Sequence, residues 1–387
     1  MRFPEFSGEW KKHSLGEIGE TIIGLTYKPS DVVDNNGIIV FRSSNIKNGM
    51  IDYSDLVRVN KHIKDKIITK ENDILVCARN GSQRLIGKNA IIKQEDANNT
   101  FGAFMMVYRA NDNPFILPLL STKKYFSQVG ENLGARINQI TTSDFNGFEF
   151  YFPENHAERT KIAELFRLLD ERIATQNKII EKLQSLIKGL SQQLLSSEND
   201  WILYRLDDLA QIKSGYSGTQ VSYQTPYKVS RIETISKHCI DIQRIGYVEC
   251  IPESYRLNVG NILFSNINSI QYIGNTAYLD KDYGLYHGMN LLRIIPNTTI
   301  VRPRFLHLLL CTDWAINHFQ TICNKAVSQA SINQTALGKS RFPIPPMSVQ
   351  QQICSMFELT ERKLDNEQEY ISCLQQQKRY LLQKMFI

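Results

Sequence analysis

The chain has 387 residues, of which 42% are hydrophobic and 22% charged, and its formal net charge is +6 at pH 7. A single core rarely grows beyond about 250–300 residues, so this length favours more than one domain, and the composition excludes wholesale disorder. No segment reaches the roughly 18 apolar residues of a membrane-spanning helix, and the start of the chain lacks the apolar core of a signal peptide. The seven cysteines are scattered and contain no C-x-x-C pair. We therefore expect a cytoplasmic protein with reduced thiols and no membrane partner.

The sequence contains two copies of one unit, 191 residues apart. Trp10-x4-Leu15 reappears as Trp201-x4-Leu206, and Gly24 has its counterpart in Gly215. Late in each copy, Ile162-x3-Phe166 returns as Ile353-x3-Phe357. This many matches in the same order indicate an internal repeat.

The register between these anchors drifts by a few residues. The best match of Ser44-Asn45-Ile46 is Ser230-Arg231-Ile232, and that of Ile137-Asn138-Gln139 is Ile332-Asn333-Gln334. Because the register matches at both ends of the repeat and shifts in between, we expect loop insertions in two domains that share one fold.

Residues 1–153 (the first mixed domain) and 197–346 (the second mixed domain) combine short β-rich runs with turn signals. Each also has one late helical stretch, predicted near 114–128 and 302–324. The predicted strands are Gly37–Phe41, Ile74–Cys77, Met105–Tyr108, Ile262–Phe264 and Leu291–Ile295.

Residues 154–196 and 347–387 read as two long helices that begin after Pro153 and after Pro345-Pro346. Their apolar residues follow the alternating spacing of four and three that is typical of a coiled-coil seam. Each helix of about 40 residues would be about 60 Å long, and its apolar stripe needs a partner helix. The predicted seam is Ile162, Phe166, Leu169, Ile173, Gln176, Ile180, Leu183, Leu190 and Leu194 in the first helix, and Ile353, Phe357, Leu364, Ile371, Leu374, Leu381 and Met385 in the second.

We expect the two helices to pair antiparallel, with Ile162 near Met385 and Ile180 near Glu367. The predicted fold is therefore α+β: two mixed α/β domains separated by two long antiparallel coiled-coil helices, with a pseudo-twofold internal repeat. A simpler alternative is that the helix pair serves only as a spacer between the two domains.

Motifs of common enzymes are absent from the sequence. It has no G-x-x-x-x-G-K-[ST] phosphate loop, no H-E-x-x-H, no G-x-S-x-G and no G-x-G-x-x-G after a strand. An amino-methyltransferase would need an Asn/Asp-Pro-Pro-aromatic tetrad, and Asn113-Pro114-Phe115 lacks the second proline. These absences predict no catalytic residues, no metal site and no cofactor bound by this chain.

Most of the positive charge lies in the mixed domains, with 19 basic and 17 acidic residues in 1–153 and 14 and 11 in 197–346. Their loops are rich in Arg, Asn, Gln and Ser. Arg fits guanine and Asn or Gln fits adenine by paired hydrogen bonds, although an ordinary solvated loop is an equally good interpretation of any single stretch. The candidate DNA-binding residues are Ser43, Asn45, Arg79, Asn80, Ser82, Gln83, Arg84, Lys88, Arg136, Asn138, Gln139, Ser230, Arg231, Asn266, Asn268, Gln271, Tyr272, Lys325, Ser328, Gln329, Asn333 and Gln334.

The whole chain resembles the specificity (S) subunits of type I restriction-modification systems. The resemblance rests on Arg2-Phe-Pro-Glu-Phe-Ser-Gly-Glu-Trp10 and on Glu158-x3-Ile162-Ala163-x-Leu165-Phe166-x2-Leu169-Asp170 with the heptads that follow. A looser version is Pro345-Pro346-x3-Gln350-Gln351-Gln352-Ile353. The second copy departs from the first in having Val349 at the place of Glu158 and Tyr380 at that of Gly189, so we expect partner contacts to differ there.

The resemblance implies that each mixed domain is a target recognition domain for one half of a bipartite double-stranded DNA site. The helices would set the gap and bind two modification (methyltransferase) subunits. Catalysis would belong to partners: S-adenosylmethionine-dependent adenine methylation to the modification subunits, and ATP- and Mg-dependent cleavage to the restriction (endonuclease/translocase) subunits. Since one duplex turn is about 34 Å, a helix pair of about 60 Å would span one to two turns.

Two other functions fit parts of the sequence. One is a non-catalytic assembly protein that uses its coiled coil, and the other is the specificity part of a combined restriction-methylation enzyme. DNA binding with and without methyltransferase subunits discriminates between them.

Overall fold

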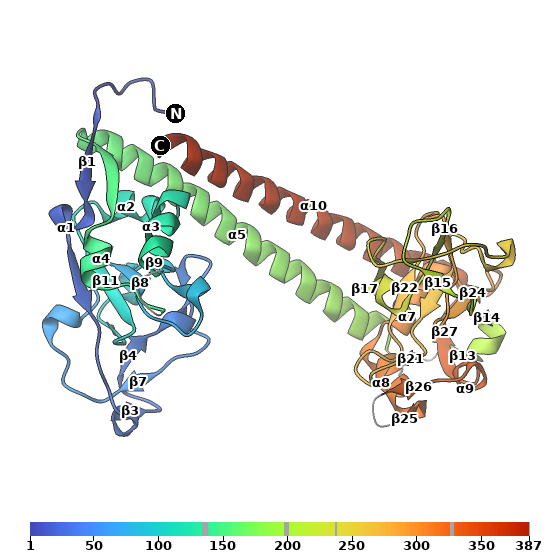
Figure 1. The fold of residues 1–387 in the computed structure, drawn as a ribbon. Helices are drawn as coiled ribbons and strands as arrows, with labels where there is room; N and C mark the ends of the chain where they lie inside the picture. Colours follow the sequence, from blue (N-terminus) through green and yellow to red (C-terminus); the bar gives the residue numbers. More distant parts are fainter. Residues whose placement is uncertain (134–137, 197–200, 237, 326–328, 387) are drawn as a thin grey trace. The chain divides into compact units, whose positions relative to one another are not determined.

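The computed structural model divides the chain into two compact units. Unit 1 comprises 1–177 with 369–387, and unit 2 comprises 178–368. Two long helices, α5 (His156–Leu194) and α10 (Met347–Met385), each begin in one unit and end in the other (Figure 1). The structure describes residues 1–133, 138–196, 201–236, 238–325 and 329–386.

Unit 1 contains the first mixed domain. Its strands are β1 (Trp10–Ser14), β2 (Glu20–Ile23), β3 (Val32–Val33), β4 (Ile38–Phe41), β5 (Ile46–Lys47), β6 (Met50–Ile51), β7 (Arg58–Val59), β8 (Ile74–Cys77), β9 (Asn89–Ile91), β10 (Thr100–Phe101), β11 (Met105–Arg109) and β12 (Glu149–Pro153). Its shorter α-helices are α1 (Leu15–Ile18), α2 (Asn113–Leu119), α3 (Lys123–Leu133) and α4 (Thr142–Asn146).

Unit 2 contains the second mixed domain. Its strands are β13 (Ile202–Arg205), β14 (Ala210–Ser214), β15 (Gln220–Val221), β16 (Tyr227–Val229), β17 (Ile235–Ser236), β18 (Cys239–Ile240), β19 (Gly246–Val248), β20 (Ile262–Phe264), β21 (Ile267–Asn268), β22 (Thr276–Tyr278), β23 (Leu285–Tyr286), β24 (Leu292–Pro296), β25 (Asn324–Lys325), β26 (Ala330–Ser331) and β27 (Arg341–Ile344). Its shorter α-helices are α6 (Leu206–Leu209), α7 (Pro303–Leu310), α8 (Asp313–Ile322) and α9 (Gln334–Gly338).

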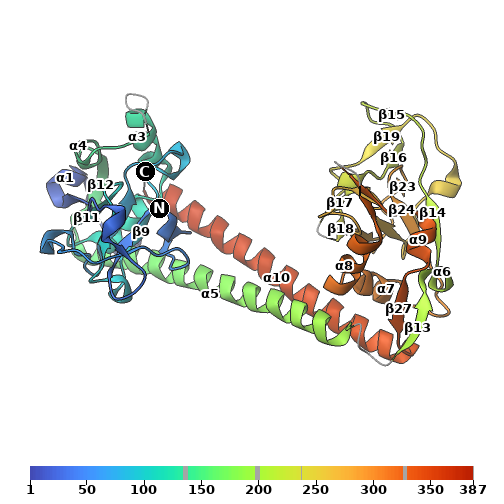
Figure 2. The same ribbon diagram turned by 90° about the horizontal axis from the view of Figure 1, so that it is seen from below.

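The two mixed domains have the same sheet topology, which confirms the predicted repeat. The sheet β2-β11-β8-β9 of unit 1 corresponds to β14-β24-β20-β22 of unit 2, and β10-β4-β7-β3 corresponds to β23-β16-β19-β15. In each second sheet one edge pair, β10 with β4 and β23 with β16, is parallel while the other pairs are antiparallel. Within each unit the strands lie beside the long helices (Figure 2).

The glycine that the repeat matches, Gly24 with Gly215, lies where the chain leaves the first sheet and pairs with the second. A Cβ on Gly24 would lie 2.3 Å from the carbonyl oxygen of Gly102, and one on Gly215 would lie 1.8 Å from that of Gly288. Leu25 forms a bridge with Gly102 at this point. Only glycine allows so close a backbone approach, which explains why both copies keep it.

The prediction of one late helix in each mixed domain is wrong, because each holds two helices. A threonine separates them: the Thr122 hydroxyl accepts a hydrogen bond from Tyr125 N (3.2 Å), and the Thr312 hydroxyl accepts one from Ala315 N (3.3 Å). Threonine at this place satisfies amide groups that have no partner within the helix. A new helix therefore begins at each threonine.

The halves of α5 and α10 that lie in unit 1 pack against one another. The Lys378 ammonium donates to the Asp170 carboxylate, and the Phe166 and Phe386 rings stack with their centroids 5.7 Å apart. The predicted register would place Asp170 opposite Gln377, one residue from Lys378. In unit 2, Phe357 of α10 and Leu190 of α5 belong to one apolar core.

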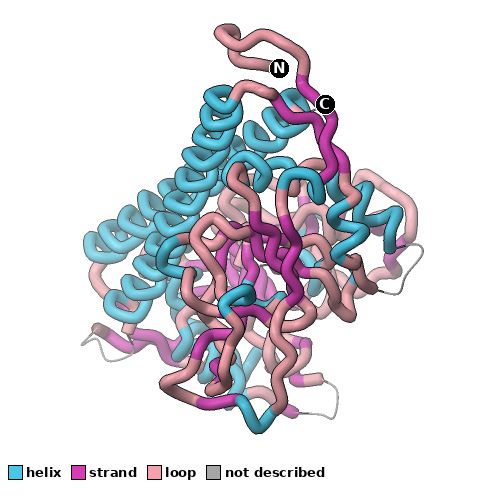
Figure 3. The backbone as a smooth tube through the Cα atoms, turned by 90° about the vertical axis from the view of Figure 1, so that its left-hand side faces the viewer, coloured by secondary structure: helices cyan, strands magenta, loops and turns pink. Residues whose placement is uncertain are grey.

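The predicted seam residues are all buried or half-buried in the described helices, whereas most residues between them are exposed. The antiparallel helix pairing of the predicted fold class is thereby confirmed. The ends of the chain also meet in unit 1, where the Met1 ammonium donates to the Lys384 carbonyl (Figure 3).

Asp73 anchors the start of β8 in unit 1. Its carboxylate, 2% exposed, accepts hydrogen bonds from Arg109 (2.7 and 2.8 Å) and from Lys70 N (2.8 Å). Asn261 takes its place in unit 2, where its side-chain oxygen accepts from Arg293 Nε (2.7 Å).

We expect Asp73→Ala to lower the unfolding free energy of unit 1 by about 3 kcal/mol, because it leaves the Arg109 guanidinium without its buried partner. Asp73→Asn keeps an oxygen for Lys70 N, as Asn261 does for Asn258 N, and should lose clearly less. Urea denaturation followed by Trp10 fluorescence measures both. Equal losses in the two variants would contradict the role assigned to the amide oxygen.

Candidate nucleic-acid interface

Three distant segments of the first mixed domain meet at the end of β8. Arg79 N donates to the Phe104 carbonyl (3.0 Å), and Asn80 N donates to the Asn138 carbonyl (3.3 Å). The Asn80 amide group also donates to the Ser43 hydroxyl (2.9 Å). Side chains that are far apart in sequence therefore share one edge of the domain.

This edge is named the first recognition surface and consists of Ser43, Arg79, Asn80, Phe104, Asn138 and Gln139. Gln139 joins it through a β-bridge with Arg79. Arg79 and Phe104 are exposed, and the four polar partners are half-buried. The sequence predicted five of these residues and missed Phe104.

The rest of the predicted loop closes on itself beyond Asn80. Ser82 N donates to the Asn80 side-chain oxygen (2.9 Å), and a 3₁₀ turn covers Gln83–Leu85. Gly87 has a φ of +81° and returns its N–H to the Cys77 carbonyl (2.9 Å). Gln83 and Arg84 are exposed at the tip of the loop, while Ser82 and Lys88 are half-buried.

Asn45 was expected at the DNA and instead lies inside the domain. Its side chain is 0% exposed, donates to the Asp52 and Asp55 carbonyls (3.0 and 2.8 Å) and accepts from Arg42 N (2.9 Å). Ser230 is equally buried, and its hydroxyl accepts from Gly288 N (3.0 Å). Since these bonds hold the backbone together, neither side chain is free to read a base.

The matched tripeptides are displaced by three residues from the true structural equivalents. Thr234, not Arg231, repeats Asn45: its hydroxyl accepts from Arg231 N (2.8 Å), as the Asn45 side chain accepts from Arg42 N. Likewise Thr141 and Asn333 both cap a following helix, accepting from Asp144 N (3.1 Å) and Ala336 N (2.7 Å). The structurally equivalent residues of the two domains are therefore identified by their hydrogen bonds and not by their residue type.

The second mixed domain has an equivalent edge, named the second recognition surface: Asn266, Asn268, Gln271, Tyr272, Lys325 and Gln329. Asn266 exchanges two hydrogen bonds with Ile332: Ile332 N donates to its carbonyl (2.8 Å), and its side-chain amide donates to the Ile332 carbonyl (3.4 Å). The Asn268 amide donates to the Ser265 hydroxyl (3.1 Å). Tyr272 is 50% exposed, and Lys325 is exposed on β25.

Three other predicted residues of this domain, and Arg136 of the first mixed domain, have internal contacts or lie outside the described ranges. The Gln334 amide donates to the Ile212 carbonyl (2.6 Å), and Arg231 Nε lies 3.7 Å from a Glu233 carboxylate oxygen. Arg136 and Ser328 lie outside the described residues.

The two surfaces differ at matching positions. Arg79 pairs with Gln139 in a bridge, and the equivalent pair in unit 2 is Ile267 with Ser331. The turn that carries Phe104 after Gly102 is matched by one that carries Met289 and Asn290 after Gly288. Thus one backbone frame presents different side chains in the two domains.

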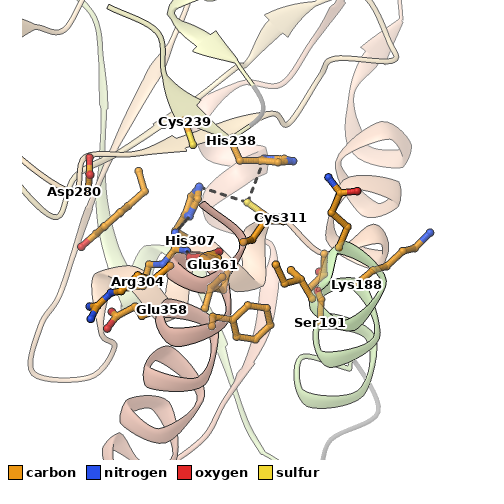
Figure 4. Close-up of a pocket in the computed structure, with 18 of the residues that line it drawn as sticks. Lys188, Ser191, His238, Cys239, Asp280, Arg304, His307, Cys311, Glu358 and Glu361 are labelled. Carbon is orange, nitrogen blue, oxygen red and sulfur yellow. Dashed lines mark hydrogen bonds and ion pairs between the residues drawn. The ribbon is translucent and has the colours of Figure 1, made fainter. Parts of the chain in front are cut away.

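Unit 2 also holds a cleft of about 1170 Å³ lined by parts of α5, α7 and α10 (Figure 4). Inside it the Cys311 sulfur lies 3.3 Å from His238 Nδ1 and 3.5 Å from His307 Nε2, and Arg304 pairs with Glu361. Burial raises the pKa of the Cys311 thiol to about 12 and lowers the pKa of His307 well below its usual value. A protonated thiol beside a neutral imidazole is not an activated nucleophile.

Within the described ranges, no three His, Cys, Asp or Glu side chains are grouped so that they could hold a metal ion. No helix in the same part of the chain is long and apolar enough to cross a bilayer.

The chain thus has two repeated domains joined by paired helices, and each domain presents a different set of side chains on an equivalent surface. Comparison with known proteins gives the family: the type I restriction modification DNA specificity domain matches residues 7–185 and 198–376, two ranges displaced by 191 residues. The chain belongs to this family.

Among its relatives, the MjaX type I restriction enzyme specificity subunit of Methanocaldococcus jannaschii is 38% identical over 193 residues, which cover 48% of this chain and 45% of that protein. The EcoKI specificity subunit of Escherichia coli K12 is 22% identical over 375 residues, covering 89% of this chain and 80% of the relative. Similarity to the first thus spans about half of each chain.

Among solved structures, the S subunit of the type I restriction-modification system from M. genitalium has the same fold. It superposes with a TM-score of 0.63 at 17% identity, covering 100% of this chain and 99% of the other.

Proposed function

We propose that this chain is the DNA sequence-specificity subunit of a type I restriction-modification complex. Each recognition surface reads one half of a bipartite double-stranded target. The observation that carries this proposal is the frame that occurs twice with unlike side chains at its exposed edge, Arg79 in one copy and Ile267 in the other. Reading two different half-sites requires this combination, because the frame positions the loops and the side chains select bases.

The subunit has no catalysis of its own and acts through partners. Two modification subunits bind the helices and methylate adenine with S-adenosylmethionine, and restriction subunits cleave DNA with ATP and Mg. Apolar side chains exposed on the helices support such docking: Leu168, Leu186 and Leu359 are 50%, 50% and 64% exposed. A solved chain from work on complex assembly of the type I R-M system shares the fold, with a TM-score of 0.57 at 15% identity.

Helix length sets the gap between the half-sites. With 39 residues each, α5 and α10 are about 60 Å long, which corresponds to between one and two duplex turns.

Methylome sequencing of a host that expresses the chain with its modification subunits tests the function. We expect a two-part motif with a fixed gap, which disappears when the gene is deleted. Arg79→Ala with Gln139→Ala should change only one half of the motif, and Gln271→Ala with Tyr272→Ala only the other. An unchanged motif in the deletion strain would refute the proposal.

A coiled-coil assembly protein is the second candidate, favoured by the same exposed apolar residues. It predicts that the chain retards no genomic DNA fragment in a gel, with or without modification subunits. Methylation by the purified chain alone would instead show an enzyme.

A further inference from the structure

The Arg79 side chain packs against an aromatic ring on the first recognition surface. Its guanidinium carbon lies 5.2 Å from the centroid of the Phe104 ring, which is a cation–π distance. In the described part of the chain, Arg79 takes part in no ion pair, although it is exposed. The nearby Arg42, in contrast, pairs with Asp55 at 2.8 Å.

The backbone beneath this pair is fixed on several sides. The Phe104 carbonyl accepts from both Ala78 N and Arg79 N, each at 3.0 Å. The turn before it is tied down as well, since Gly102 N donates to the Phe41 carbonyl (2.9 Å) and Ala103 N to the Leu25 carbonyl (2.9 Å). Phe104 is nevertheless 60% exposed, so the turn presents its ring at the surface on a rigid base.

Stacking on a ring leaves the edge of a guanidinium free. That edge carries paired N–H donors, which match the O6 and N7 acceptors of guanine in the major groove. A phosphate contact needs no such restriction of a long side chain. A ring that packs against the guanidinium restricts the arginine before binding, which reduces the conformational entropy lost on binding.

We propose that Arg79, positioned by Phe104, reads a guanine in the half-site of the first mixed domain. This inference rests on the proposed function and assigns one residue of that site to one base. The second mixed domain lacks both members of the pair, with Ile267 in place of Arg79, so its half-site is read by other chemistry.

The test uses the full chain in complex with its modification subunits and the bipartite DNA motif found by methylome sequencing. Dissociation constants are measured for the intact motif and for duplexes with each base pair of the first half-site replaced in turn. We expect Arg79→Ala to reduce discrimination at one G·C pair by about 5- to 150-fold. Discrimination throughout the other half-site should remain unchanged.

Two further variants separate the base contact from charge. Arg79→Lys keeps the charge without the planar fork and should lose most of the same discrimination. Phe104→Ala keeps Arg79 but removes the ring that packs against it. This variant should therefore lose part of the discrimination at the same G·C pair. Lys93→Ala removes one charge from the same domain outside the surface and should alter no base preference.

Binding that weakens equally for all duplexes in Arg79→Ala, with the salt slope reduced by about 1, would show a phosphate contact and overturn the inference. Full discrimination in Arg79→Lys or Phe104→Ala would overturn it too. These outcomes presuppose a wild-type bipartite motif, and its absence would instead refute the proposed function. Thermal melting of each variant shows whether it is folded.

Discussion

The Arg2→Ala variant is expected to lose about 3 kcal/mol of unfolding free energy in unit 1. Both Arg2 bonds to Glu158, from Nε and from the terminal NH2 group, are 2.6 Å long, and the Glu158 side chain is 0% exposed. Among the described residues, the substitution would leave the buried carboxylate with one side-chain donor, the Trp10 indole N–H at 3.4 Å. Breaking a buried ion pair by removing one partner costs about 3–5 kcal/mol.

Trp10 provides the measurement, because its ring contacts both Phe115 and Phe386 in the core of unit 1. Urea titrations would follow its fluorescence in a background with Trp201→Phe and Trp314→Phe. Lys161→Ala is the matched control: it removes the contact of Lys161 with Glu5, an ion pair whose side chains are each 47% exposed, and should cost less than about 1 kcal/mol. If both variants unfolded at the same urea concentration, Arg2 would not be the partner that keeps Glu158 buried.

The same pair gives Glu158 a role within the chain. From the sequence we expect partner contacts to differ where Val349 stands at the place of Glu158, and this stays a prediction. Glu158 holds Arg2, near the start of the sequence, onto α5, and Gln350 anchors α10 through different hydrogen bonds. The Gln350 side chain accepts from Arg302 N (2.7 Å) and donates to the Ile300 and Pro345 carbonyls.

Unit 2 is expected to lose stability between pH 6.5 and pH 4 because of His287. The imidazole is 1% exposed and donates from Nε2 to the Leu291 carbonyl (3.0 Å), and burial with Arg293 nearby lowers its pKa to about 4. An unfolded histidine has a pKa near 6.5, so in this window the unfolded state binds a proton that the folded state does not. Unfolding free energy therefore falls as pH falls, by about 1.4 kcal/mol per pH unit and by about 3 kcal/mol in all.

Urea denaturation followed by Trp201 and Trp314 fluorescence, at pH 7 and pH 5, would measure this loss. His287→Gln removes the titrating group and should lose about 2 kcal/mol less than the wild type between these pH values. His307, whose pKa burial also lowers, adds to the wild-type loss and remains in the variant. Equal losses in both proteins would show that His287 is protonated in the folded state.

Much of the fold could be predicted because its strongest signals are apolar and periodic. The seam of α5 and α10 repeats over many turns, and Gly24 and Gly215 mark a crossing that no other residue fits. The helix break at Thr122 was not predicted, since the apolar pattern continues across it and only one hydroxyl marks the new start.

The candidate site was less predictable, because polar side chains look alike whether they cap a turn or face solvent. Asn45 and Arg79 both lie in polar stretches. The Asn45 side chain is buried and makes several internal hydrogen bonds, whereas Arg79 is exposed. Phe104 was missed because it lies in an apolar run with Phe101 and Tyr108, which are core residues. Only its turn, fixed by Gly102, brings the ring to the surface.

The recognition frame is built from main-chain groups: Arg79 N to the Phe104 carbonyl, Ile140 N to the Ala78 carbonyl, and in the second copy Ile332 N to the Asn266 carbonyl. Substitution of a side chain leaves every one of these donors and acceptors in place unless it introduces proline. Mutations of an exposed side chain such as Arg79 therefore carry little folding penalty, whereas Asn80 also bonds Ser43 and Ser82 through its side chain. At the exposed positions a lineage can sample new targets one residue at a time. The specificity of the protein can therefore evolve while its fold stays the same.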